Sequence, residues 1–246
     1  MNTATAENKV MYISQAENFS KIPGSPIAYW VSPAFGKNFD NSSFSDFSNV
    51  ITGMTIGDNN KYLRFWYEIV FNTIGIGYNS IDAIFSDGKY WIPYSKGGER
   101  RNWYGNNEMV VNWKHKNNFN RAKTTLQHLY LREALTWPFI TPGNFSARLL
   151  TVGFLWDVAG SPCFFDDEEL EKYALGLLCS KVTNLTLKII NPTINVQAVD
   201  IQHLPFIYDE ERKDLVVSMV NECVKDAQLD WDCVETSWDF KKHPLI

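Results

Sequence analysis

The chain has no apolar stretch that approaches the roughly 20 residues needed to cross a bilayer. Its most apolar segment, "ALGLLCSKVTNLTLKII" at residues 174–190, is interrupted by Lys181 and Lys188. The first residues, "MNTATAENKVMYISQ", lack the basic start and apolar run of a secretory signal. We therefore expect a cytoplasmic protein without a membrane contact.

Cysteine and histidine are scarce, and their spacing excludes the common metal motifs. The four cysteines form no Cys-x-x-Cys pair, so neither a zinc site nor a disulfide framework is predicted. The four histidines form neither a His-x-x-x-His nor a His-Glu-x-x-His pattern. The acidic run "DDEELE" at residues 166–171 does not match a calcium-binding loop, and acids are favoured at a helix N-terminus.

Motifs for catalysis are also missing. There is no Gly-x-Ser-x-Gly elbow and no Gly-Lys-Ser/Thr phosphate loop, and "TIGIGYNS" at residues 73–80 lacks the third glycine of a dinucleotide loop. Asp157 and Asp200 lie in apolar sequence and are readable as a carboxylate pair or as turn residues bonded to the backbone. No third group is evident to orient a pair, which favours the turns. We expect no self-contained enzyme and no cofactor.

The chain does have a large apolar content and an uneven distribution of charge. Its 246 residues are 45% hydrophobic and 15% aromatic, with nine tryptophans, which suits a buried core and also recognition surfaces. The net charge is -5. Residues 96–123 nevertheless carry seven lysines and arginines against two glutamates, while residues 208–246 carry ten acids against five bases. Local charge governs steering, so a polyanionic partner remains compatible with the acidic total.

Periodicity and turn residues predict a mixed α/β (α+β) fold. We expect residues 1–9 to be disordered, residues 10–207 to form one domain with a mixed sheet and flanking helices, and residues 208–246 to form a C-terminal helix and tail. The strands are expected in "KVMYIS", "SNVITGM", "KYWIPY", "LTWPFITP", "SARLLT", "GFLWDVAG" and "INVQAVDIQHLPFI". The helices are expected at about residues 121–133, 166–180, 181–190 and 209–228, the last with Leu215, Val216, Met219, Val220, Cys223 and Val224 on one side.

The segment "RRNWYGNNEMVVNW" at residues 100–113 concentrates arginine, tryptophan and asparagine. Gly105, Asn106 and Asn107 tolerate positive φ, so the pattern predicts a hairpin turn followed by a half-buried strand. Such a hairpin is consistent with a solvated turn, a sugar platform or a surface that contacts nucleic acid.

Several strings in order resemble the large adenine-specific DNA methyltransferases of the BREX phage-defence system, called PglX. They are "KIPGSPIAYWVS" (21–32), "GDNNKYLRFWYEI" (57–69), "RRNWYGNNEMVVNW" (100–113), "SARLLTVGFLWDVAGSPCF" (146–164), "LLCSKVTNLTLKIINPTINVQAVDIQHLPF" (177–206) and "DWDCVETSWDFKKHPLI" (230–246). Members of that family carry an S-adenosylmethionine loop and an Asn-Pro-Pro-Tyr type loop. Here the nearest string is Asn191-Pro192-Thr193, which lacks the second proline and the aromatic residue.

The resemblance implies a target-recognition domain that binds double-stranded DNA and needs a methyltransferase core or other BREX components as partners. In such domains lysine and arginine contact phosphates, while arginine, asparagine and glutamine read base edges. The DNA-binding candidates that follow are Lys96, Arg100, Arg101, Asn106, Asn107, Lys114, Lys116, Arg121, Lys123, Asn144, Ser146 and Arg148.

Two other functional classes fit parts of the sequence. The acidic C-terminal helix and the tail "ETSWDFKKHPLI" are consistent with a module that docks to other phage-defence proteins. Exposed tryptophans would suit a carbohydrate-binding module.

Overall fold

The computed structural model describes residues 22–26, 28, 30–122, 124–243 and 245. The terminus expected to be disordered and the strand expected in "KVMYIS" lie outside the described residues. Among those that are described, no helix combines the length and hydropathy that crossing a bilayer requires.

Eight short strands of the described residues form two four-stranded sheets, which confirms the predicted mixed α+β class. The first sheet is antiparallel throughout and has the order β1 (Asn49–Val50), β8 (Pro162–Phe164), β5 (Ala134–Thr136), β6 (Arg148–Leu150). The second has the order β2 (Leu63–Phe65), β4 (Met109–Asn112), β3 (Trp91–Ser95), β7 (Leu155–Trp156), and its β3–β7 pair is parallel.

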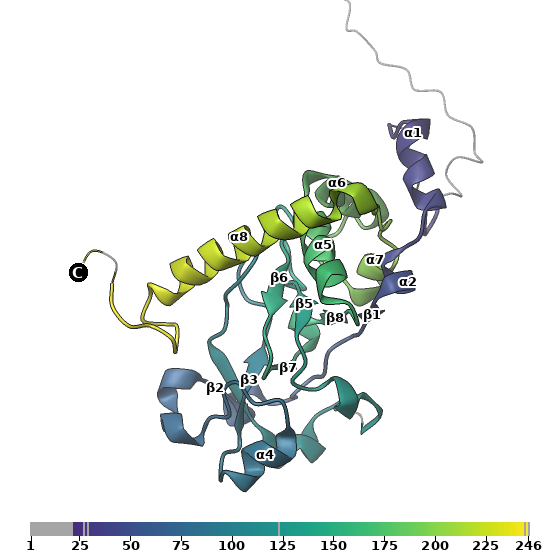
Figure 1. The fold of residues 1–246 in the computed structure, drawn as a ribbon. Helices are drawn as coiled ribbons and strands as arrows, with labels where there is room; N and C mark the ends of the chain where they lie inside the picture. The colour runs from purple at the N-terminus through teal and green to yellow at the C-terminus, as the bar shows by residue number, and fades with distance from the viewer. Residues whose placement is uncertain (1–21, 27, 29, 123, 244, 246) are drawn as a thin grey trace, which may run out of the picture.

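The longer helices gather around the first sheet, while the second sheet lies at the other end of the molecule beside α4 (Figure 1). The α-helices are α1 (Pro33–Gly36), α2 (Phe44–Phe47), α3 (Asn59–Tyr62), α4 (Ile81–Ser86), α5 (Glu168–Leu178), α6 (Lys181–Ile190), α7 (Ala198–Gln202) and α8 (Lys213–Asp232). The 3-10 helices are η2 (Lys37–Asp40), η3 (Trp66–Glu68), η4 (Phe71–Thr73), η5 (Trp113–Asn118), η6 (Thr124–Leu129), η7 (Val158–Gly160) and η8 (Glu210–Arg212).

Side-chain caps fix the starts of α5 and α6 where the sequence predicts them. Asp167 accepts a hydrogen bond from the Leu170 N–H at 2.8 Å, and Ser180 accepts one from the Thr183 N–H at 3.1 Å. Helix α8 then packs along α5 at Gly176, where a Cβ atom would lie 2.9 Å from Val220. The missing side chain therefore sets how closely the two helices approach.

The apolar face predicted for the C-terminal helix is divided in the structure. Val216, Val220 and Val224 pack into the core cluster of the first sheet, which confirms one half of the prediction. Leu215 and Met219 are 62% and 58% exposed, so their assignment to the buried face is wrong. Each of the two residues comes directly before a valine of the row that packs into the core, Val216 and Val220 respectively, and its side chain is on the solvent side of the helix.

Two other predicted elements are wrong. The strand expected in "INVQAVDIQHLPFI" contains α7 instead, because the Asp200 carboxylate accepts the Gln197 N–H at 2.7 Å and caps a helical turn. The α-helix expected at about residues 121–133 is the shorter 3-10 helix η6. Leu131, with a φ of 64°, ends this region and exchanges backbone hydrogen bonds with Phe154 and Gly153.

Candidate functional site

The segment predicted to be a hairpin is a long loop, residues 96–108, that connects β3 to β4. Strand β4 pairs with β3 and β2, whereas residues 102–104 form no strand and only Trp103 makes a bridge, to Arg148. The tight hairpin turn predicted at residues 105–107 is therefore wrong, whereas the half-buried strand expected after it is β4, which pairs antiparallel with β3. The turn residues do adopt the predicted backbone conformation, with φ of 115° at Gly105 and 62° at Asn106.

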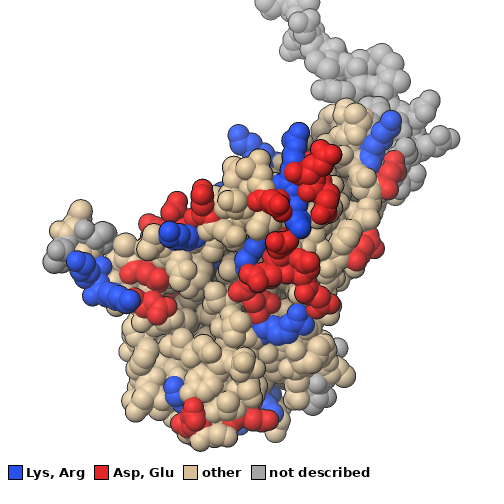
Figure 2. Space-filling view, in the orientation of Figure 1, with Lys and Arg blue, Asp and Glu red and all other residues tan. Residues whose placement is uncertain are grey.

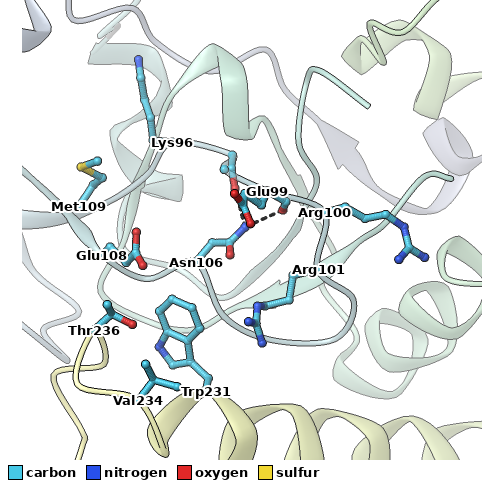
Figure 3. A pocket seen from close by; sticks show the side chains of 12 residues that line it. Lys96, Glu99, Arg100, Arg101, Asn106, Glu108, Met109, Trp231, Val234 and Thr236 are labelled. Atoms are coloured by element: carbon cyan, nitrogen blue, oxygen red, sulfur yellow. Dashed lines mark hydrogen bonds between the residues drawn. The ribbon is translucent and has the colours of Figure 1, made fainter. Parts of the chain in front are cut away.

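Asn106 and Asn107 hold the 96–108 loop from within. The Asn106 side-chain amide donates to the carbonyls of Gly97 at 3.1 Å and Glu99 at 2.8 Å, the second of which is drawn in Figure 3. Asn107 is 4% exposed and hydrogen-bonds Tyr104, whose pKa burial raises to about 12. Both asparagines therefore stabilise the conformation of the loop.

The 96–108 loop meets the segment that carries the candidates Asn144, Ser146 and Arg148. The Arg100 Nε atom donates to the carbonyl of Asn144 at 3.0 Å. The Trp103 N–H donates to the Ala147 carbonyl at 2.9 Å. The 96–108 loop and residues 144–148 therefore form one connected surface, with Arg100 and Asn144 exposed on it.

Arg148 and Ser146 lie beneath this surface. Arg148 is 2% exposed and donates through Nη2 to the Gly97 carbonyl. Burial, followed by the nearby Arg101 charge, lowers the Arg148 pKa to about 10, so the guanidinium remains protonated at neutral pH. Ser146 is fully buried. The structure places neither side chain where it would reach a ligand at the surface.

Lys96 anchors the start of the 96–108 loop through a buried carboxylate. Its Nζ atom lies 2.7 Å from Asp157 Oδ2, and Asp157 is 1% exposed. The Tyr94 hydroxyl donates to the same oxygen at 3.0 Å, and the Ala159 N–H donates to Oδ1 at 2.9 Å. Asp157 therefore bonds the local backbone in a turn, and Asp200 does the same at the start of α7.

Arg101 joins the 96–108 loop to the C-terminal end of α8. Its Nη1 atom lies 3.0 Å from Asp230, and its guanidinium lies 5.0 Å from the centre of the Trp231 ring. Figure 3 shows Arg101 pointing toward Trp231 while Arg100 points away from it. No local pattern in the sequence indicated Trp231 or Asp230, because they lie about 130 residues beyond the loop.

A pocket of about 450 Å³ separates the loop from this helix end. Lys96, Arg100 and Arg101 line it together with Glu99 and Glu108, so its charges are mixed. Burial, and then Glu99, raises the pKa of Glu108, while Arg101 opposes the shift. The mixed charges of the lining therefore do not favour a small ligand with a strong charge of either sign.

The remaining basic candidates lie at the other end of the second sheet. Lys114 and Lys116 are in η5, which follows the far end of β4, and Arg121 comes shortly after it. Because β3 and β4 are antiparallel, the length of β3, about 16 Å at roughly 3.3 Å per residue, separates them from the 96–108 loop. Lys114 Nζ lies 3.6 Å from the centre of the Tyr90 ring. Lys123 lies outside the described residues.

Within the described part of the chain, no group of three or more His, Cys, Asp or Glu side chains is placed to hold a metal ion. The exposed candidates are thus Arg100 and Asn144 on one surface and Lys114, Lys116 and Arg121 on another. Lys96, Arg101 and Asn106 are half-buried by contacts within the protein.

Comparison with known proteins identifies two similar sequences. An adenine-specific methyltransferase PglX of Lacticaseibacillus casei (strain Zhang) is 33% identical over 250 residues, which is 96% of this chain and 20% of that protein. An adenine-specific methyltransferase BrxX of Escherichia coli O9:H4 (strain HS) is 34% identical over 235 residues, 93% of this chain and 18% of that protein. No family model matches the chain. The chain spans about a fifth of the length of these relatives.

Proposed function

Since the chain is homologous to a region of the PglX and BrxX adenine-specific methyltransferases, we propose that it is a non-catalytic DNA sequence-recognition domain of this kind. It would bind double-stranded DNA and direct a separate methyltransferase core, in BREX phage defence, to its adenine. The observation that carries the proposal is the connected surface formed by the 96–108 loop and residues 144–148.

Arg100 is the side chain of this surface best suited to DNA. It is exposed, and among the described residues no carboxylate lies within ion-pair distance of its guanidinium. Its Nε atom is held by a backbone carbonyl, which orients the planar end without neutralising the charge. Such a guanidinium suits a phosphate or the O6 and N7 acceptors of guanine. The exposed amide of Asn144 beside it is of the type that pairs with adenine.

The proposal narrows the roles predicted from the sequence. Arg101, Asn106, Asn107, Ser146 and Arg148 would shape and support the surface, since each is occupied or buried within the protein. Lys114, Lys116 and Arg121 would contact phosphates further along the duplex, because they lie at the other end of the second sheet.

DNA binding by Arg100→Ala tests the assignment directly. Fluorescence anisotropy with a mixed-sequence duplex should show weaker binding, and the slope of log K against log salt should fall by about 0.9, the value for one phosphate contact. Arg212→Ala is the matched control, because Arg212 is exposed just before α8 and pairs with Asp209 across its own turn. If both variants bind as the parent does, Arg100 has no part in the interface.

Sequence recognition requires a second assay. The chain is co-expressed with the methyltransferase core of a relative, and N6-methyladenine is mapped across the genome. We expect a methylated motif that appears only when this chain is present, and Asn144→Ala should relax that motif at one position. The absence of a new motif with a demonstrably active core would contradict a role in target recognition.

The outward side of α8 favours a second candidate function, docking to another phage-defence protein. Leu215, Met219 and Leu229 are 62%, 58% and 58% exposed on one helix, and exposed apolar residues that recur along a helix are typical of protein interfaces. A pull-down in the presence of nuclease should lose its partner with Leu215→Glu and keep it with Asn221→Glu, at an exposed position on another side of α8. Equal capture by both variants would exclude this face.

A further inference from the structure

A second pocket, of about 440 Å³, lies at the N-terminal end of α5, away from the 96–108 loop. Acidic side chains gather on the face of the molecule drawn in Figure 2. The charged residues that line the pocket are four acids and one base: Glu133, Asp166, Glu168, Glu171 and Arg132. The proposed DNA-binding role assigns nothing to this pocket.

Glu171 distinguishes this pocket from an ordinary acidic helix start. The residue is 4% exposed, and its Oε1 atom is buried without a hydrogen-bond partner among the described residues. The neighbouring charges are already paired, since Lys172 lies 2.6 Å from Glu133 and Arg132 lies 3.2 Å from Asp166. An unsatisfied buried carboxyl oxygen is costly, and natural structures retain few of them.

The chemistry of the lining restricts what would satisfy this oxygen. An anion is disfavoured because the lining carries three more negative than positive charges when its acids are ionised. A metal ion is disfavoured because the described residues include no group of three or more ligands placed to hold one. Ammonium and guanidinium groups remain, since each brings a positive charge and several N–H donors.

We propose that the α5 pocket binds an ammonium or guanidinium group, which donates a hydrogen bond to Glu171 Oε1 while Glu168 lies at the rim of the pocket. The same chemistry is supplied by a free amine and by a lysine or arginine side chain of a partner protein.

Protonation gives the proposed site a distinctive pH dependence. Burial, and then Glu133, raises the pKa of Glu171 to about 8. The other groups that face it are Glu168 and Lys172 from α5, Arg132 and Asp166 beside the pocket, and the buried thiol of Cys163 on β8. A bound cation favours the ionised carboxylate. At pH 6.5 Glu171 is mostly protonated, so binding must release its proton, whereas at pH 8.5 most of the carboxyl is already ionised and fewer protons are released. Affinity should therefore increase between pH 6.5 and pH 8.5.

The test is isothermal titration of the full chain with agmatine and, separately, with a blocked Gly-Arg-Gly peptide. At pH 8.5 we expect a saturable site whose affinity falls at least about tenfold in Glu171→Gln. Glu168→Gln, at an exposed pocket position, should weaken binding severalfold and guards against a folding defect in the first variant. Glu222→Gln, exposed on α8, is the matched control and should bind as the parent does.

Each result decides between the alternatives. Tighter binding of agmatine than of the peptide supports a small amine as the ligand, and the reverse supports a basic side chain of a partner. The absence of saturable binding of either probe, or an equal loss in Glu171→Gln and Glu222→Gln, would overturn the proposal. DNA binding by Arg100→Ala is measured independently, so failure of one proposal leaves the other standing.

Discussion

The buried contact between Lys96 and Asp157 should control the stability of the 96–108 loop. Asp157 accepts hydrogen bonds from the Lys96 ammonium at 2.7 Å, the Tyr94 hydroxyl at 3.0 Å and the Ala159 N–H at 2.9 Å. Lys96 is the first residue of the loop, Tyr94 belongs to β3, and Ala159 lies in η7 after β7. A change at Asp157 therefore affects the sheet and the loop together.

The expected loss of unfolding free energy follows from the burial of the Lys96 and Asp157 side chains. Removing one partner of a fully buried ion pair costs about 3–5 kcal/mol, because the other charge is left uncompensated. The Lys96 side chain is 28% exposed and Asp157 is 1% exposed, so water stabilises an orphaned ammonium better than an orphaned carboxylate. We expect a loss of about 2 kcal/mol for Asp157→Asn and about 3 kcal/mol for Lys96→Met. The double variant should lose about 2–3 kcal/mol, less than the sum of the two single losses, which corresponds to a coupling energy of about 2–3 kcal/mol.

Equilibrium unfolding in urea, followed by tryptophan fluorescence and by circular dichroism, measures these values if the two probes coincide. Asp226→Asn is the matched control, since Asp226 is exposed on α8, and its effect should stay within about 0.5 kcal/mol. Additive single variants, with a coupling energy below about 0.5 kcal/mol, would refute the argument that the two charges depend on each other.

Three further predictions concern the packing around the site. Gly97→Ala should destabilise the protein by at least about 2 kcal/mol in urea unfolding, because Gly97 has a φ of 80° and a Cβ atom there would lie 2.1 Å from the Ala159 carbonyl oxygen. Gly143→Ala, with nothing within 4 Å, should be nearly neutral. Trp231→Ala should cost about 3–5 kcal/mol and should speed hydrogen exchange in residues 96–106; unchanged exchange would contradict the docking of α8 on the loop. Iodoacetamide at pH 8, followed by mass spectrometry, should modify the half-buried thiols of Cys223 and Cys233 before those of Cys163 and Cys179, whose pKa burial raises to about 12.

The helices of the last third could be predicted because their signals are local. Asp167 and Ser180 are residues of the capping type that precede apolar periodic segments, and each caps the helix that follows it. Strands β3, β5, β6 and β7 likewise follow short apolar runs bounded by turn residues. Where two local signals compete, prediction fails: the alternating residues of 194–207 suggest a strand, yet the Asp200 cap produces a helical turn.

The candidate site could be predicted only in part, because its geometry depends on contacts between distant segments. The sequence marks residues 96–108 and residues 144–148 as polar and basic, and the structure brings them together. The sequence does not indicate that Arg148 is buried or that Arg101 forms an ion pair with Asp230 on α8. Spacing along the chain also groups Lys114 with Lys96, whereas an antiparallel ladder places them at opposite ends.

In the 96–108 loop, the side chains that stabilise the backbone are different from the side chains that are exposed. Asn106 and Arg148 satisfy the carbonyls of Gly97 and Glu99, and Arg101 joins the loop to Trp231. The carbonyls of Gly97 and Glu99, which would otherwise need a ligand or solvent, are thus paired within the protein. Arg100 stays exposed on a backbone that does not depend on it, so its replacement should change what the surface binds with little effect on folding. A surface built in this way would allow its exposed side chains to vary while the fold is retained, as the proposed sequence-recognition role requires.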